Sequence, residues 1–330
     1  MATHLSMLED ILKLAIAQNA SDIHLKPGLP AVYRINGRLL TFKDAPRLSL
    51  EHTYKMAYSM MDEKMRAVFE AKRQVDLAYS VQGLGRFRVN IYQQRGTIAI
   101  AMRPIPSLIR TFKELNLPQV LEKICAEQHG LVLLTGTTGC GKSTTLAAMI
   151  DYINSKRTCH IVTIEDPIEY LIQDRMSIIS QREVGFDAPS FLEGLRAALR
   201  QDPDVIMVGE MRDLETIETA MHAAETGHLV MSTLHTLNAV ETVNRIISMF
   251  PSHQQEQVRY QLANILKAVV SQRLIARADG RGRIPAVEVL ISTARIRQCI
   301  RDKTKTHEIQ QAIEEGTNYG MQSFDQSLID

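Results

Sequence analysis

The pattern of apolar and polar positions changes along the chain and divides it into two parts. Up to residue 106, apolar residues recur at helical spacing over Leu5–Gln18 and again over Leu50–Ala71. Between and after these helices, short alternating runs predict strands, and Asn36-Gly37 predicts a hairpin turn. Helices, a hairpin and antiparallel strands together predict a compact α+β domain over residues 1–106.

From residue 119 onward, apolar strands alternate with amphipathic helices. This alternation is typical of a mainly parallel α/β sheet covered by helices on both faces. Prolines and polar residues separate the two patterns, so we expect a linker over residues 107–118 and a second domain over residues 119–330. The strands are predicted at Leu131–Thr135, His160–Ile164, Ser177–Ser180, Val205–Val208, Leu229–Ser232, Val269–Leu274 and Ala286–Leu290.

The first strand of this series leads into a glycine-rich turn that fits the pattern G-x-x-x-x-G-K-[ST] at every fixed position. Its glycines let the backbone adopt positive φ and turn successive N–H groups toward phosphate oxygens. Lys142 would neutralise phosphate charge, and the Ser143 hydroxyl would hold Mg²⁺. The residues expected to bind a polyphosphate are Gly136, Thr137, Thr138, Gly139, Cys140, Gly141, Lys142, Ser143 and Thr144.

Acidic residues follow two of the later strands. Glu165 comes after His160–Ile164, and Glu210 comes after Val205–Val208. A carboxylate at such a strand end can reach the Mg²⁺ shell or orient the attacking water, and phosphoryl transfer depends on both. Glu165 and Glu210 are therefore candidate catalytic residues, and Glu210 is also a candidate Mg²⁺ ligand. The pattern leaves open which of the two is the base.

Two histidines bracket the strand Leu229–Ser232, with His228 before it and His235 after it. A single histidine in such a place is usually a structural hydrogen-bonding group. Two of them beside the expected site are also candidates for sensing the γ-phosphate or for contacting a neighbouring subunit, and both interpretations stay open.

Composition narrows the function classes. The 38 Lys and Arg and 37 Asp and Glu residues leave a net charge of +1, which gives no general attraction to nucleic acid. The 4 cysteines form no C-x-x-C pair, which favours reduced thiols and argues against a zinc site. Without a signal peptide or an apolar run of about 20 residues, we expect a cytoplasmic protein with no segment inserted in a membrane.

The motifs together resemble those of the secretion ATPase superfamily, the RecA-like hexameric motors of type IV pili and type II secretion. Residues 136–143 match its Walker A motif, 163–169 its aspartate box, 202–213 its atypical Walker B motif and 227–236 its histidine box. Residues 1–106 resemble its PAS-like domain. The resemblance implies an α/β fold with a RecA-like P-loop ATPase core and a smaller N-terminal α+β domain. It also implies ATP and Mg²⁺ as ligands and assembly as a homohexamer.

Within the superfamily, the chain is most similar to the pilus retraction ATPases (PilT-like), because it carries neither the extra N-terminal domain nor the paired-cysteine zinc module of the other branches. Residues 295–302 also resemble the Ala-Ile-Arg-Asn-Leu-Ile-Arg-Glu segment associated with retraction, with departures at Arg295, Gln298-Cys299 and Asp302. This similarity implies a motor for pilus disassembly and twitching motility. An inner-membrane platform protein would be its partner and would keep it peripheral to that membrane.

The resemblance also gives a role to arginines in the N-terminal part. Arg88 and Arg103 match positions that, in the family, reach a nucleotide bound by the neighbouring subunit, with Arg86 and Arg212 as alternatives. A guanidinium suits this role because its fork of donors can neutralise charge on the γ-phosphoryl group. Three other functions stay open: a pilus-assembly or type II secretion ATPase, a nucleic-acid translocase, and a nucleotide switch with negligible turnover.

Overall fold

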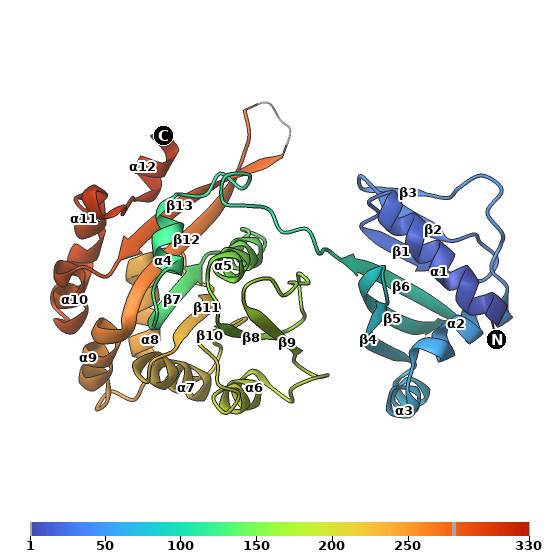
Figure 1. Cartoon of the computed structure of the whole chain (residues 1–330), viewed down its shortest axis with the longest axis horizontal. Coiled ribbons are helices and arrows are strands. Elements are labelled where there is room, and N and C mark those ends of the chain that lie inside the picture. Colours follow the sequence, from blue (N-terminus) through green and yellow to red (C-terminus); the bar gives the residue numbers. More distant parts are fainter. Residues whose placement is uncertain (1, 279–281, 330) are drawn as a thin grey trace. The chain divides into compact units, whose positions relative to one another are not determined.

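The computed structural model describes residues 2–278 and 282–329, and these form two compact units. One unit is Met1–Ser107 and the other is Leu108–Asp330 (Figure 1). The two units fall on either side of the change in hydrophobic pattern along the chain.

In the described part of the first unit, six strands form an antiparallel sheet in the order β3-β2-β1-β6-β5-β4. The helices bury apolar side chains, such as Leu12 and Met56, against one face of this sheet. Along β5, buried Phe87 and Val89 alternate with exposed Arg88, so the opposite face is polar. The elements are α1 (Ala2–Ala17), β1 (Asp22–Leu25), β2 (Val32–Ile35), β3 (Arg38–Leu40), α2 (Leu50–Met60), α3 (Glu63–Lys72), β4 (Gln74–Val81), β5 (Gly85–Gln94) and β6 (Thr97–Ile105).

The structure corrects the prediction of one helix over Leu50–Ala71. The chain breaks at Met61, which is extended, and α3 restarts after Asp62, whose carboxylate accepts a hydrogen bond of 2.8 Å from the Met65 amide. An aspartate in this position is a strong N-cap, which competes with continuation of the preceding helix. The prediction also missed β1, a strand of 4 residues at the centre of the sheet.

Within the described residues of the second unit, seven strands form a sheet in the order β13-β12-β7-β11-β10-β8-β9. Every neighbouring pair is parallel except β12 and β13. The mainly parallel sheet is therefore confirmed, with β12 and β13 longer than predicted. The strands are β7 (Gly130–Thr135), β8 (His160–Glu165), β9 (Ile178–Glu183), β10 (Val205–Val208), β11 (Leu229–Leu234), β12 (Leu266–Ala276) and β13 (Arg283–Ile291).

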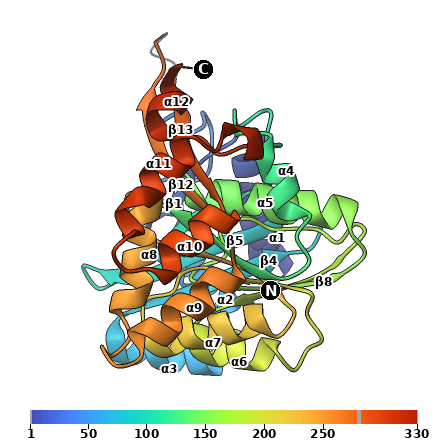
Figure 2. The ribbon, with the colours of Figure 1, turned by 90° about the vertical axis from the view of Figure 1, so that its left-hand side faces the viewer.

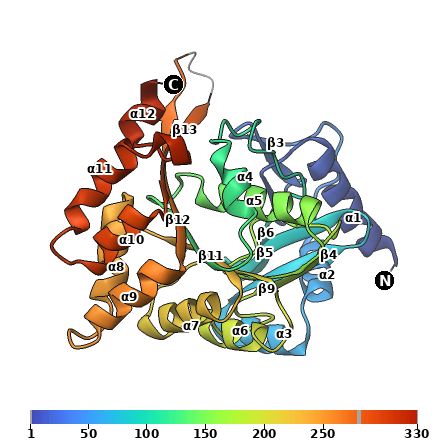
Figure 3. The same cartoon turned by 60° about the vertical axis from the view of Figure 1, so that its left-hand side comes forward.

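Helices cover both faces of this sheet (Figures 2 and 3). Apolar residues of α4 (Val120–Cys125) and α5 (Lys142–Lys156) pack on one face. The other face is covered by α6 (Phe191–Ala198), α7 (Leu214–Glu225), α8 (Ala239–Ser248), α9 (Gln255–Ile265), α10 (Ala294–Arg301) and α11 (Ile309–Glu314). The last helix, α12 (Phe324–Ile329), contacts β13. Phe112 and Leu117, which fall in the predicted linker, are buried with the α4–α5 face of this core.

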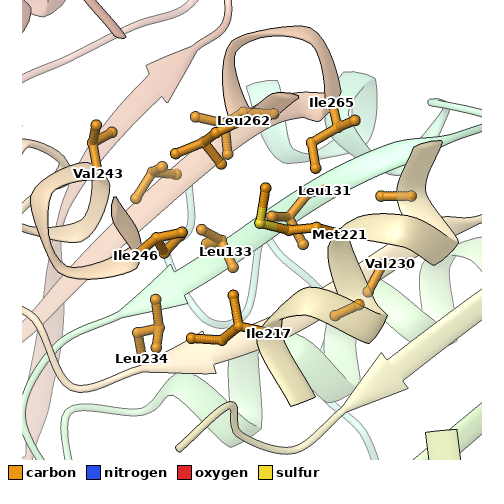
Figure 4. Packing of buried hydrophobic residues seen from close by; sticks show 14 of the residues in the cluster. Leu131, Leu133, Ile217, Met221, Val230, Leu234, Val243, Ile246, Leu262 and Ile265 are labelled. Carbon is orange, nitrogen blue, oxygen red and sulfur yellow. The ribbon is translucent and has the colours of Figure 1, made fainter. Parts of the chain in front are cut away.

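Strand β7 is buried on both faces, which explains its uninterrupted apolar sequence. Leu131 and Leu133 pack against Ile217, Met221 and Ile246 on one side (Figure 4). The alternate residues Val132 and Leu134 pack on the side of α4 and α5. Because its neighbours β11 and β12 run parallel to it, the carboxyl ends of these strands meet at one edge. The glycine-rich turn leaves β7 at that edge.

Candidate functional site

The turn after β7 has the backbone that its glycines predict. Gly136, Gly139 and Gly141 have φ of 140°, 77° and 97°, a region that other residues rarely adopt. At Gly136 there is also no room for a side chain, because a Cβ would lie 2.4 Å from the Gln272 carbonyl oxygen of β12. The turn then enters α5 at Lys142, so the first amides of the helix face the same region.

Lys142 lies inside the turn and is only 8% exposed. Its Nζ donates hydrogen bonds to the carbonyl oxygens of Gly136, at 2.7 Å, and Thr137, at 3.0 Å. The thiol of Cys140 is buried beside it, 4.0 Å from Nζ. The ammonium group is thus held where the polyphosphate is expected, and a bound phosphate would take over the donors that now serve backbone carbonyls.

Gln272 of β12 is a site residue that the sequence interpretation missed. Its Oε1 accepts a hydrogen bond of 2.8 Å from Thr145 in α5, and its side chain is buried. Gln272 also lines two pockets beside the turn. The pocket of about 300 Å³ includes Gly136–Cys140, and the pocket of about 490 Å³ includes Gly141, Thr144 and Thr145. A polar residue within an apolar strand was the sequence signal that could have identified Gln272. Its partner Thr145 lies more than 100 residues away in the chain, so the sequence pattern did not show the contact.

The strand order decides how near the candidate carboxylates lie to the turn. From β7 the next strands are β11, then β10, which ends before Glu210, and then β8, which ends with Glu165. With about 4.8 Å between neighbouring strands, β10 is displaced sideways from β7 by about 10 Å and β8 by about 14 Å. Both carboxylates lie at the same edge as the turn, and Glu210 follows the nearer strand.

Glu165 is 7% exposed and is held by groups of β8, of β9 and of the segment that follows β8. Its Oε1 accepts hydrogen bonds from Thr163 Oγ1 at 2.7 Å and from Gln181 Nε2 at 3.0 Å, and its Oε2 accepts one from the Glu169 amide at 3.4 Å. Burial raises the pKa of Glu165, although the bonds from Thr163 and Gln181 act in the opposite direction. The segment that follows β8 returns to α5, where the Tyr170 hydroxyl lies 3.0 Å from Thr144 Oγ1.

Glu210 and His235 come together in the structure. The His235 Nε2 atom lies 3.5 Å from Glu210 Oε2, and the Arg212 guanidinium pairs with Glu210 Oε1 at 2.5 Å. The Glu210 side chain is 14% exposed, whereas those of His235 and Arg212 are largely exposed. A carboxylate and an imidazole at neighbouring strand ends can together hold a water molecule or a metal-bound oxygen.

His228 does not join this group, and a role for it at the site or at a neighbouring subunit stays a prediction. It precedes β11, whose 6 residues span about 20 Å, and therefore lies at the opposite edge of the sheet from His235. Its Nδ1 lies 2.9 Å from the Ala223 carbonyl oxygen at the end of α7. This contact is typical of a side chain that binds a helix C-terminus.

Arg88 and Arg103 lie on the polar face of the first unit, directly opposite each other on β5 and β6. Asp22 of β1 holds Arg103 through two bonds to its Oδ1, of 2.7 Å and 3.0 Å. Burial opposes ionisation of Asp22, but the bonds from Arg103 and Ser21 outweigh it and lower its pKa. Among the described residues, the Arg88 side chain makes no hydrogen bond or ion pair, so its charge is not compensated. The sequence carried no signal for Asp22.

The residues present fit a magnesium ion. In the described ranges, no cluster of three His, Cys, Asp or Glu side chains forms a complete metal cage. Mg²⁺ usually needs no such cage, because it binds one or two protein oxygens together with substrate phosphates and waters. Ser143 is exposed at the start of α5, and Glu210 supplies a carboxylate at the same edge of the sheet. Across the described chain, no helix has the length and apolar character needed to cross a membrane.

The burial of Glu165 predicts how stability depends on pH. Because its pKa is raised in the folded state, the folded protein holds the proton more tightly, so this group lowers the free energy of unfolding as pH rises. We expect Glu165→Gln to unfold at higher urea concentration than wild type at pH 8, with a difference that shrinks toward pH 5. Glu218→Gln, which replaces an exposed carboxylate on α7, is the control. If the difference in unfolding between Glu165→Gln and wild type does not change with pH, the raised pKa of Glu165 is contradicted.

Comparison with known proteins identifies the family. A family model described as type II/IV secretion system protein matches residues 2–281. The type IV pilus retractation ATPase PilT of Pseudomonas aeruginosa is 43% identical over 97% of this chain and 92% of its own length. A crystal structure of the pilus retraction motor PilT with bound ADP is 49% identical, covers 97% of this chain and 95% of its own, and superposes with a TM-score of 0.84.

A more distant relative has the same fold. The ATPase DotB of Legionella pneumophila is 30% identical, with a TM-score of 0.75 over 98% of this chain and 90% of its own. These similarities confirm the RecA-like core with a smaller N-terminal domain and the resemblance to pilus retraction ATPases. The chain belongs to the type II/IV secretion system protein family.

Proposed function

We propose that this protein is an ATP-hydrolysing motor that drives retraction of type IV pili. The observation that carries the proposal is the gathering of the phosphate-binding turn, Glu210 and His235 at the carboxyl edge of one parallel sheet. The turn supplies a nucleotide site, and the other two residues supply groups that act on its terminal phosphate. The similarity to PilT over nearly the whole of both chains supports pilus retraction as the movement that the motor drives.

In the proposed mechanism, backbone amides of residues 136–141 and the Lys142 ammonium hold the phosphates of ATP. Ser143 and Glu210 would hold Mg²⁺, which would neutralise phosphate charge when bound. Glu210 and His235 orient the attacking water. Glu165, whose two oxygens already accept bonds from Thr163, Gln181 and the Glu169 amide, holds the segment that follows β8 and stays the alternative base.

The exposed pair Arg88 and Arg103 suggests that each site is completed by a second copy of the chain. Arg88 has no acidic partner among the described residues, and its neighbour Arg103 is held by Asp22. In a homohexamer, Arg88 and Arg103 would reach the γ-phosphate bound by the adjacent subunit and stabilise the charge of the transition state. Hydrolysis would then change the angle between the two units through residues 107–118.

The partner proposed for this movement is an inner-membrane platform protein of the pilus. Binding to it would place a cytoplasmic ring against the membrane without any segment of the chain entering it. The net charge of +1 gives no support to a nucleic-acid cargo.

We expect ATP hydrolysis that requires Mg²⁺ and falls about 100-fold or more in Lys142→Ala, because the charge that neutralises the phosphates is lost. Ser143→Ala should need a higher Mg²⁺ concentration for half-maximal rate. Ser155→Ala, at the other end of the same helix, is the matched control and should behave as wild type. Wild-type turnover no greater than that of Lys142→Ala would instead support a nucleotide switch.

The direction of force is tested in cells. Deleting the gene of a retraction motor should leave abundant surface pili and abolish twitching motility, and the Lys142→Ala protein should fail to restore it. Loss of surface pili would favour the pilus-assembly alternative. Normal pili and motility with a secretion defect would favour the type II secretion alternative. Stimulation of ATP hydrolysis by DNA or RNA would favour a nucleic-acid translocase.

A further inference from the structure

Another buried carboxylate lies in the sheet of the ATPase unit, outside the site described above. Glu288 of β13 is 1% exposed. Its Oε1 accepts hydrogen bonds from the Ala239 amide, at 2.8 Å, and from Ser271 Oγ, at 3.1 Å. Burial raises the pKa of Glu288, and both bonds act against that effect. Glutamate is rarely buried so completely, and burying it costs stability that an apolar residue would not cost.

The first bond fastens the segment that carries His235. Ala239 is the first residue of α8, and residues 235–238 join the end of β11 to that helix. Leu237 in this segment lines the pocket beside Gly136–Cys140. Other bonds of the segment run to its own helix: the Leu237 amide to Glu241 at 3.0 Å, and Thr236 Oγ1 to Thr242 Oγ1 at 2.6 Å. Among the described residues, the bond to Glu288 is the hydrogen bond that joins this helix start to a strand of the sheet.

The second bond leads toward the phosphate-binding turn. Ser271 lies opposite Glu288 on one side and Thr135 of β7 on the other. Thr135 directly precedes Gly136, and its buried Oγ1 makes no hydrogen bond within the described residues. Thr135, Ser271 and Glu288 thus form a buried polar row across three strands, which starts at the turn and ends at the first amide of α8.

Glu288 satisfies the Ala239 amide, which the N-cap of α8 leaves unpaired, and it does so from a strand of the sheet. The Asn238 side chain accepts a hydrogen bond of 2.8 Å from the Glu241 amide. What Glu288 adds is a fixed relation between the start of α8 and the strands that flank the turn.

We propose that Glu288 is a positioning residue of the ATPase site, which fixes the His235 segment relative to the phosphate-binding turn. The inference rests on the proposed function, in which His235 acts at the γ-phosphate. Without Glu288, the nucleotide would bind as before, but His235 would no longer be held beside Glu210. The chemical step depends on such placement far more than binding does.

The kinetic test compares Glu288→Leu, Glu288→Gln and Val289→Ala. Leucine fills the site without an acceptor, glutamine keeps an acceptor oxygen, and Val289→Ala destabilises the same strand on its opposite face. We expect kcat of Glu288→Leu to fall about 10-fold or more with an almost unchanged KM for ATP. Glu288→Gln should recover most of kcat, and Val289→Ala should keep it. Equal losses in Glu288→Leu and Val289→Ala, or no recovery with glutamine, would overturn the proposal.

Amide hydrogen exchange on the full chain gives a readout that is independent of hydrolysis. In Glu288→Leu, the amides of residues 235–242 should exchange faster than in wild type, while those of residues 136–145 keep their rate. In Val289→Ala, the exchange rates of the two segments should not change relative to each other. Exchange that rises equally in both segments, or in neither, would overturn the proposal even if wild type proved inactive. If Glu288→Leu does not fold, Ser271→Ala replaces it, with kcat lower by about threefold and the same exchange pattern expected.

Discussion

The close approach of β12 to the turn after β7 is the constraint on which the site depends. A Cβ at Gly136 would meet the Gln272 backbone at 2.4 Å, so the two segments can pack this tightly only because position 136 carries no side chain. The Gln272 side chain then reaches Thr145 on α5. One glycine and one glutamine therefore set how the turn, the helix and the central strands lie together.

Each of the two units also keeps groups that cost stability. Glu165 and Glu288 are buried carboxylates, each with a pKa raised by desolvation and each held by hydrogen bonds from neighbouring segments. Arg88 and Arg103 face each other across two strands, an arrangement of like charges that is unfavourable in an isolated sheet. Such conflicts are typical of functional sites, where the arrangement serves a reaction and not the stability of the fold.

The sequence predicted most of the features that depend on neighbouring residues. The apolar run before Gly136, the glycines of the turn and the alternation of strands with helices all have local causes. The sequence did not reveal Gln272, Asp22 or Glu288, because each acts through a partner that only the register of the sheet brings near. The helix break at Asp62 was missed because helical spacing continues on both sides of it. His228 and His235 lie apart because residues that bracket a strand lie at opposite edges of the sheet.

If a site on one chain is completed by arginines of another, mixing two inactive variants should restore activity. Arg88→Ala lacks the donated group, and Glu210→Ala lacks the group at the receiving site. We predict that each variant alone is nearly inactive and that their mixture recovers part of the wild-type ATP hydrolysis, because some interfaces combine two intact halves. Wild-type activity should also rise with protein concentration as rings assemble. Activity independent of concentration, with no recovery on mixing, would contradict the account and place a complete site within one chain.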